Sequence, residues 1–148
     1  IICITANQKT LCINKNKPGD IKGILNAHEF LSTHDCSRVH RPWGWYESRI
    51  KFPNYQVKRL HVNPKGKLSL QSHKRRSEHW VVVEGVAKVQ KNDEVFTLGR
   101  NESIYLNKED KHRLWNEEDH ALEVIEVQVG DYLEEDDIIR YDDIYNRT

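Results

Sequence analysis

Short apolar stretches that alternate with polar positions dominate the chain from residue 55 onward. These stretches are rich in β-branched and aromatic residues, and Gly, Asn, Asp or Pro bounds them, which is the pattern of short strands separated by turns. The intervening segments 63–66, 91–93 and 117–120 have turn or loop chemistry. Many short strands with regular turns indicate an all-β sandwich or barrel. The predicted strands are 56–62, 78–83, 86–90, 95–98, 103–106 and 121–129.

The first 35 residues follow a different pattern. Two apolar segments, 1–4 and 11–13, flank a polar turn and predict a hairpin. Asp20 is suited to cap a helix whose apolar positions fall on one stripe, namely Ile21, Ile24, Leu25 and Leu31. This strand, strand and helix unit is too small to bury its own apolar face. We therefore expect an N-terminal extension over residues 1–35 and a main domain over residues 36–148.

Length and charge limit the kinds of protein to which this chain can belong. A chain of 148 residues suits one compact domain with a substantial core. Equal numbers of basic and acidic residues, 23 each, argue against a nucleic-acid partner held by a general basic field. No apolar run approaches membrane-spanning length, and no N-terminal segment has the order of a signal peptide. The three cysteines are odd in number, which favours reduced thiols and a cytoplasmic location.

Four residues form the most informative chemical pattern. They are Gln71, His73, Glu78 and His112, and together they offer an amide oxygen, two imidazoles and a carboxylate. This set suits a divalent transition metal and leaves room for a water or a sugar oxygen. Zinc is the preferred ion, with cobalt, nickel, manganese and magnesium as alternatives. Residues two apart on a strand face the same side, so Gln71 and His73 can point at one ion. We expect Glu78 and His112 to come from neighbouring strands.

The spacing resembles the first motif of the cupin superfamily, read from Gly66 to Gly85 with Gln71 in place of the first His. The second cupin motif is weaker, because Asn107 and Glu109 stand where Pro and Gly are usual. Within the superfamily the chain is similar to type II phosphomannose isomerase, the C-terminal domain of bifunctional mannose-6-phosphate isomerase and mannose-1-phosphate guanylyltransferase. The strings that carry this resemblance are Arg41-Pro42-Trp43-Gly44-Trp45-Tyr46-Glu47, Leu68-Ser69-Leu70-Gln71-Ser72-His73, Ser77-Glu78-His79-Trp80, His112-Arg113-Leu114, Ile125-Glu126-Val127-Gln128 and Tyr132-Leu133-Glu134-Glu135-Asp136-Asp137-Ile138.

The resemblance implies a fold, a reaction and residue roles. The fold is a cupin double-stranded β-helix, or jelly-roll barrel, with the metal in its mouth. The reaction interconverts mannose 6-phosphate and fructose 6-phosphate through an enediol. Arg76 resembles the catalytic arginine of the family. Arg113, together with Lys58 or Arg59, is a candidate for binding the substrate phosphate, because a guanidinium can hold phosphate oxygens in pairs. Gln128 is a candidate to lie near the substrate.

The resemblance also implies a longer protein. Residues 1–35 look like the junction that closes a guanylyltransferase region, so the chain is expected to be linked to an N-terminal guanylyltransferase domain in a GDP-mannose-forming enzyme. The expected partner is a small sugar phosphate, without nucleic acid or membrane, and a homodimer is one option for the oligomeric state.

Two other functions compete with the isomerase. One is a metal-binding cupin of other activity, such as an oxygenase, which the Gln71 ligand makes less favourable. The other is a non-catalytic sugar-binding module, which predicts damage to the ligand set. The proton-transferring group also stays open among free carboxylates, a metal-bound water and His79, although His79 should face away from Glu78 along the strand. We expect the aromatic residues near Trp43 to form a flap packed on the barrel, and the acidic C-terminal end to be docked.

Overall fold

The computed structural model describes residues 2–6, 9–13, 38–142 and 144–145. The chain divides into two compact units, Ile1–Asp35 and Cys36–Thr148. In the first unit, β1 (Ile2–Ala6) and β2 (Lys9–Ile13) pair antiparallel, which confirms the predicted hairpin. The second strand starts two residues earlier than the pattern predicted. The helix expected from Asp20 lies outside the described residues.

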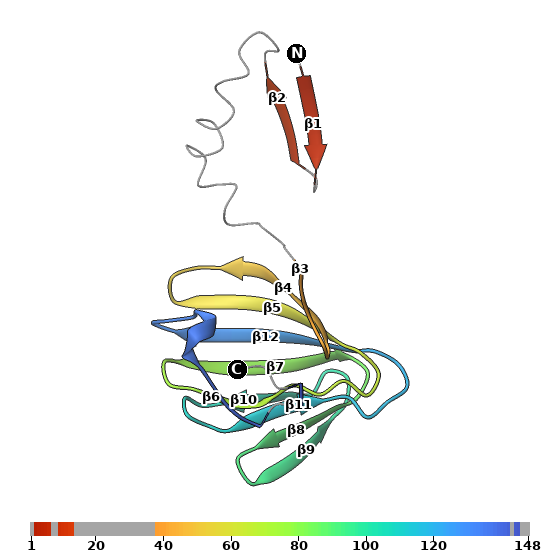
Figure 1. Ribbon diagram of the computed structural model, residues 1–148, viewed down its shortest axis with the longest axis vertical. Coiled ribbons are helices and arrows are strands. Elements are labelled where there is room, and N and C mark those ends of the chain that lie inside the picture. Colours follow the sequence, from red (N-terminus) through yellow and green to blue (C-terminus); the bar gives the residue numbers. More distant parts are fainter. Residues whose placement is uncertain (1, 7–8, 14–37, 143, 146–148) are drawn as a thin grey trace. The chain divides into compact units, whose positions relative to one another are not determined.

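The second unit consists of two antiparallel sheets that face each other (Figure 1). One sheet has six strands in the order β10-β7-β12-β5-β4-β3, and the other has five in the order β13-β6-β11-β8-β9. This arrangement is the predicted double-stranded β-helix. The strands are β3 (Arg38–Arg41), β4 (Gly44–Lys51), β5 (Tyr55–Val62), β6 (Leu70–His73), β7 (Arg76–Glu84), β8 (Ala87–Lys91), β9 (Glu94–Leu98), β10 (Ser103–Leu106), β11 (His112–Trp115), β12 (Leu122–Gly130) and β13 (Ile138–Asp142).

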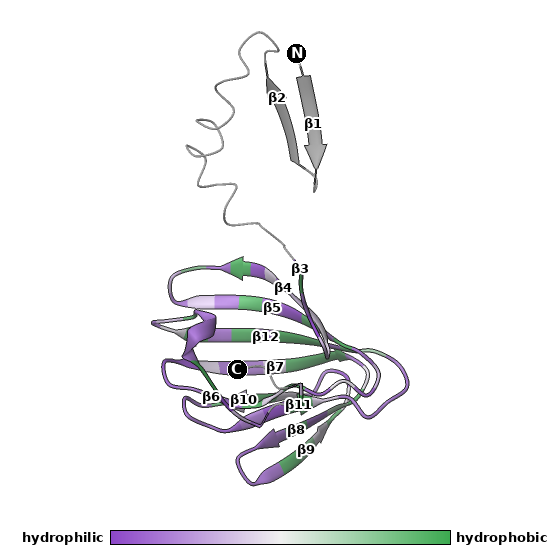
Figure 2. Cartoon of the chain, in the orientation of Figure 1, coloured by the Kyte–Doolittle hydropathy of each residue, from purple (hydrophilic) through white to green (hydrophobic). Residues whose placement is uncertain are grey.

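Alternation along each strand builds the interior. On β5, every second residue from Gln56 to Val62 is buried, as the period of two requires. The apolar core comprises Trp43, Leu60, Val62, Leu68, Trp80, Val82, Ala87, Val89, Leu106, Leu114, Leu122 and Val124. Burying one such aliphatic side chain stabilises the fold by roughly 1.5–3 kcal/mol. Toward one end of β5, β7 and β12 the inward positions become polar. Figure 2 shows the change from hydrophobic to hydrophilic most clearly along β7. The candidate site lies at this polar end.

Two regions extend the sheets beyond the predicted strands. Within the second unit the sequence pattern indicated no strand before residue 55, yet β3 and β4 form a hairpin whose second strand pairs with β5. Trp43 is buried in the core and Tyr46 packs against it, so the aromatic segment is packed on the barrel as expected. At the C-terminal end, the 3-10 turn η3 (Glu135–Asp137) leads into β13, which pairs with β6. The acidic end is therefore docked.

Among the residues that the structure describes, none belongs to a helix with the length and apolar character needed to cross a membrane.

Candidate metal centre and the adjoining cavity

Three buried side chains converge at the polar end of the barrel. His73, Glu78 and His112 are each at most 2% exposed, and their ligating atoms all lie within 4.8 Å of one another. The Nε2 atom of His73 is 3.1 Å from Oε1 of Glu78, and the Nε2 atom of His112 is 3.6 Å from Oε2 of the same carboxylate. Two imidazoles and a carboxylate gathered around one point form a ligand set suited to a divalent metal.

The strands that supply these residues differ in part from the prediction. β11 pairs with β6, and His112 lies opposite Gln71, so these two ligand candidates do come from neighbouring strands. Glu78 does not, because β7 belongs to the six-stranded sheet. The chain leaves one sheet after His73 and enters the other at Arg76, which brings Glu78 to the cluster from across the barrel. The three residues thus bridge the two sheets.

The hydrogen bonding of the two histidines fits a bound cation. Nδ1 of His112 lies 2.9 Å from the carbonyl oxygen of Asp110, which places the proton on Nδ1 and leaves the Nε2 lone pair free toward Glu78. Nε2 of His112 and both ring nitrogens of His73 are buried and have no hydrogen-bond partner among the described residues. Buried polar atoms without partners are uncommon in folded proteins. A metal ion between the two imidazoles would satisfy Nε2 of His112 and one nitrogen of His73.

Three neighbours fix the Glu78 carboxylate. Its Oε1 atom accepts hydrogen bonds from Nε of Arg76 at 3.2 Å and from Nε2 of Gln128 at 3.0 Å, and its Oε2 atom accepts one from Nε1 of Trp80 at 3.1 Å. Burial raises the pKa of Glu78, but His73, His112 and Arg76 together outweigh it and hold that pKa well below its usual range. The carboxylate is therefore oriented and ionised, as a metal ligand must be.

Gln71 lies beside the cluster. It is half-buried, and its Oε1 atom accepts a hydrogen bond of 3.1 Å from the hydroxyl of Ser69. On β6 it shares a face with His73, and it lines the same cavity as Glu78. Its role as a fourth ligand stays a prediction.

A cavity opens next to the cluster, and Glu78 is among its lining residues. Its polar lining includes several carboxylates and cations, and the full lining is Arg41, Trp43, Tyr46, Lys58, Leu60, Leu68, Ser69, Gln71, Arg76, Glu78, Glu126, Gln128, Glu135, Ile138 and Arg140.

Sequence reasoning missed Glu126 as a site residue. Its carboxyl accepts hydrogen bonds from Nε1 of Trp80 and Nε2 of Gln128, both at 3.0 Å. Burial, followed by the charge of Glu78, raises the pKa of Glu126 to about 8. A usable signal existed, since Glu126 stands two residues before Gln128 and must share its strand face.

The structure brings some of the other predicted residues to the cavity. Arg76 is 2% exposed and donates from Nη1 to the carbonyl oxygen of Glu134 at 2.9 Å. Lys58 is buried and pairs with Glu135 at 2.8 Å. Gln128 is 1% exposed, and its Oε1 atom has no hydrogen-bond partner among the described residues. All three side chains line the cavity.

Two predicted phosphate-binding residues do not line it. Arg59 pairs with Glu123 at 2.9 Å, and its guanidinium lies 5.2 Å from the ring centre of Trp45. Arg113 donates to the carbonyl oxygen of Asp142 at 3.0 Å. The alternation of the strands explains both positions, because Arg59 follows the inward Lys58 and Arg113 follows the inward His112. Because neither Arg59 nor Arg113 lines the cavity, its geometry does not support a substrate-binding role for either residue.

His79 faces away from the cluster, as the strand period predicted. It is exposed, and its Nε2 atom lies 3.1 Å from the hydroxyl of Ser103.

Comparison with known proteins identifies the family of the chain. The profile of the family described as "Mannose-6-phosphate isomerase C-terminal" matches residues 26–143. The chain belongs to this family. Alginate biosynthesis protein AlgA of Pseudomonas aeruginosa is 40% identical over 151 residues, which cover 100% of this chain and 31% of that protein. Mannose-1-phosphate guanylyltransferase ManC of Salmonella typhimurium is also 40% identical over 151 residues, which cover 100% of this chain and 32% of that protein.

These matches confirm the resemblance seen in the sequence, and the chain spans about a third of the length of the curated relatives it matches. Among solved structures, an uncharacterized protein of Klebsiella pneumoniae with a double-stranded β-helix domain has a TM-score of 0.63 at 13% identity. The match covers 74% of this chain and 93% of that one. At this identity the likeness concerns the fold alone, and it agrees with the two-sheet architecture of the mannose-6-phosphate isomerase C-terminal family member described above.

Proposed function

We propose that this chain is a metal-dependent aldose-ketose isomerase that interconverts mannose 6-phosphate and fructose 6-phosphate, as the C-terminal part of a GDP-mannose-forming enzyme. The observation that carries the proposal is the convergence of His73, Glu78 and His112, with unpartnered imidazole nitrogens, on a cavity in a member of this family. The ligand set is undamaged, which argues against a non-catalytic sugar-binding module.

The metal would be held by His73, Glu78 and His112, with Gln71 as the fourth ligand. Zinc suits two imidazoles with oxygen ligands, and it leaves a position for a substrate oxygen. When bound, a divalent ion supplies Lewis-acid polarisation of the open-chain carbonyl. The remaining chemistry belongs to the side chains around it.

Arg76 and Gln128 would orient the sugar and stabilise charge. Isomerisation through an enediol places negative charge on a substrate oxygen while the proton next to the carbonyl is removed. The buried guanidinium of Arg76, held by Glu78 and by the Glu134 carbonyl, offers fixed positive charge where that oxygen develops. The unpartnered Oε1 atom of Gln128 is suited to accept a hydrogen bond from a sugar hydroxyl.

A side chain must also carry the proton between C1 and C2. His79 is exposed on the outer face of its strand, which leaves it unsuited to this step. The carboxyl of Glu126 lines the cavity and shares the donors Trp80 and Gln128 with Glu78. Its position makes Glu126 the best candidate to take the proton.

The test is a pair of measurements on the purified chain. Metal content is measured by mass spectrometry, and fructose 6-phosphate formed from mannose 6-phosphate is followed in a coupled assay. The proposal expects bound divalent metal, and turnover that chelation abolishes and metal restores. Bound metal without isomerisation would point instead to a cupin of other activity, and sugar binding without metal or turnover would point to a binding module.

A further inference from the structure

One side of the cavity is cationic. Lys58 enters it from β5 with a side chain that is only 7% exposed, and Arg41 lines it from the end of β3. The Lys58 ammonium lies 4.7 Å from the ring centre of Tyr46 and 2.8 Å from Oε1 of Glu135. Among the described residues, Glu135 is the only carboxylate within ion-pair distance of this ammonium. The anionic partner of the buried lysine is thus a residue of the C-terminal segment.

The two members of this ion pair are unequally buried. The Glu135 side chain is 45% exposed, whereas Lys58 is almost fully enclosed. Glu135 belongs to η3, a turn of three residues in which none is buried. Burial raises the pKa of Glu135, but Lys58, followed by Arg76 and Arg41, outweighs this effect and lowers that pKa, so several cations act on this one carboxylate. Lys58 and Arg41 belong to strands of the barrel, whereas Glu135 belongs to an exposed turn on its surface.

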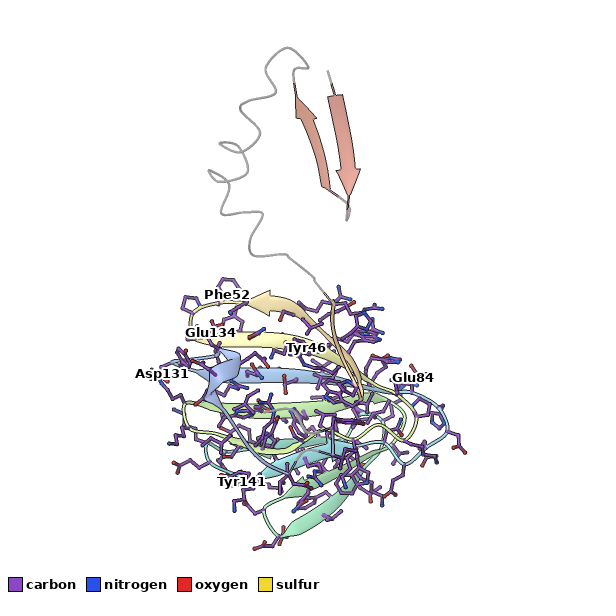
Figure 3. All side chains as sticks on the ribbon, in the orientation of Figure 1. Tyr46, Phe52, Glu84, Asp131, Glu134 and Tyr141 are labelled. Carbon is purple, nitrogen blue, oxygen red and sulfur yellow. The ribbon has the colours of Figure 1, made fainter. Side chains whose placement is uncertain are left out.

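Other contacts hold the segment that carries Glu135. Glu134 pairs with Lys51 at 2.8 Å, and Figure 3 shows Glu134 and Asp131 at the end of the barrel where β12 leads into η3. The carboxylate of Asp137 accepts hydrogen bonds from the backbone amides of Lys74 and Arg75, at 3.3 and 3.1 Å. β13 then pairs with β6. Glu135 can therefore leave Lys58 while the segment stays docked.

The cationic side also lies at a suitable distance from the metal centre. Lys58 is directly opposite Glu126 on β12, and Glu126 is opposite Trp80 on β7, two residues from Glu78. Two strand spacings separate β5 from β7, which is on the order of 10 Å. An open-chain sugar phosphate can span this separation, with its carbonyl near Glu78 and its phosphate near Lys58.

We propose that Lys58 and Arg41 form an oxyanion subsite for the phosphate of the substrate, and that Glu135 is an internal counterion which the phosphate displaces. This inference rests on the proposed function. A phosphate group carries about two negative charges and three acceptor oxygens, so it satisfies Lys58 and Arg41 together, whereas Glu135 bonds only Lys58. In the free protein, Glu135 is the ion-pair partner of a buried ammonium, which also lies in the field of Glu126 on the neighbouring strand.

The test measures binding of inorganic phosphate to the whole chain by isothermal titration calorimetry. Glu135→Gln should bind phosphate roughly tenfold more tightly, because the competing carboxylate is gone while its shape is kept. Glu134→Gln is the matched control, since it removes the adjacent carboxylate that pairs with Lys51, and it should change the affinity less than about twofold. Lys58→Gln should weaken binding roughly tenfold or more.

Unchanged or weaker phosphate binding by Glu135→Gln would overturn the inference, and so would equal tightening by Glu134→Gln, which would indicate a general charge effect. Circular dichroism of each variant establishes that it is folded, and Glu135→Ala serves as the second variant if the glutamine form is not. The isomerase assay separates this inference from the proposed function. If the wild type turns over substrate but Glu135→Gln does not change the phosphate affinity, only the inferred phosphate subsite is refuted. If the variants show the expected phosphate affinities but the wild type shows no turnover, the phosphate subsite is supported and the proposed isomerase function is refuted.

Discussion

Replacing Arg76 with lysine tests the role of the guanidinium independently of metal binding. Arg76 is 2% exposed, and it donates from Nε to Glu78 and from Nη1 to the Glu134 carbonyl, at 3.2 and 2.9 Å. Lysine keeps the positive charge but offers a single ammonium on a flexible stem, which cannot reproduce the planar fork. The variant should therefore lose positioned charge at the cavity and retain the three ligand side chains.

The size of the effect follows from these two contacts. Losing a preorganised donor that faces a developing oxyanion lowers kcat by roughly 10²–10³-fold, and the retained charge puts Arg76→Lys near the lower end of that range. A lost hydrogen bond to a charged group costs about 1.5–3 kcal/mol, part of which lysine recovers, so the free energy of unfolding should fall by about 1–3 kcal/mol. Metal content should stay at the wild-type level.

Arg75→Lys is the matched control. Arg75 is the next residue along the chain, but its side chain is 50% exposed and pairs with Asp131 on the surface. Its substitution should leave kcat and metal content within about twofold of wild type. The assay measures kcat and KM for mannose 6-phosphate alongside metal content and chemical unfolding. Wild-type kcat in a metal-loaded Arg76→Lys protein, or equal losses in both variants, would refute the catalytic role of Arg76.

Three further predictions concern the metal, the proton and acid stability. His112→Ala should reduce metal content to background and abolish turnover, as mass spectrometry and the coupled assay would show; retained metal would contradict the assignment. Glu126→Gln should keep the metal and lower kcat by about 10²-fold or more, and near-normal kcat would remove Glu126 from proton transfer. Burial raises the pKa of Glu123, but hydrogen bonds from Arg59 and His61 outweigh it and lower that pKa, so its ionised form stabilises the fold above the ordinary value of 4.5. This stability should be lost as the pH falls through the lowered pKa, so the unfolding free energies of wild type and Glu123→Gln should converge as the pH is lowered through the acid range below 4.5. A difference that stays constant over that range would contradict this pairing.

Local pattern accounts for most of the fold. From residue 55 onward, alternation and turn residues predicted β5, β7, β8, β9, β10 and β12, because each of these strands buries one face and the period of two is visible without tertiary context. The short strands β6 and β11 and the C-terminal β13 were not among the strands predicted from the pattern. β3 and β4 were not predicted from their pattern. Their residues mix polar and aromatic types, and both faces carry tertiary contacts. On one face Trp45 stacks on His61 and Glu47 pairs with Arg38, and on the other face Tyr46 packs against the core. Alternation is weak where polar and aromatic side chains are packed on both sides of a sheet.

The candidate site was predictable where its residues are close in the chain. Gln71, His73 and Glu78 lie within eight residues, so their types and spacing are readable directly. The contact between Lys58 and Glu135 joins residues 77 positions apart, and it depends on how the C-terminal segment packs across the barrel. The prediction that Glu78 lies on a strand next to that of Gln71 and His73 was also wrong. A period of two determines which face of a strand a residue lies on, but it does not determine which strand lies beside it.

The central claim is that His73, Glu78 and His112 hold a divalent ion that isomerisation of mannose 6-phosphate requires. The most direct measurement removes metal from the purified chain with a chelator, adds back zinc, cobalt, nickel, manganese or magnesium one at a time, and records fructose 6-phosphate formation together with bound metal. We expect about one ion per chain, no turnover in the stripped protein, and recovery of turnover with at least one of these ions in the wild type but with none in His112→Ala. Full turnover in the stripped protein, or metal binding and activity that survive in His112→Ala, would contradict the claim.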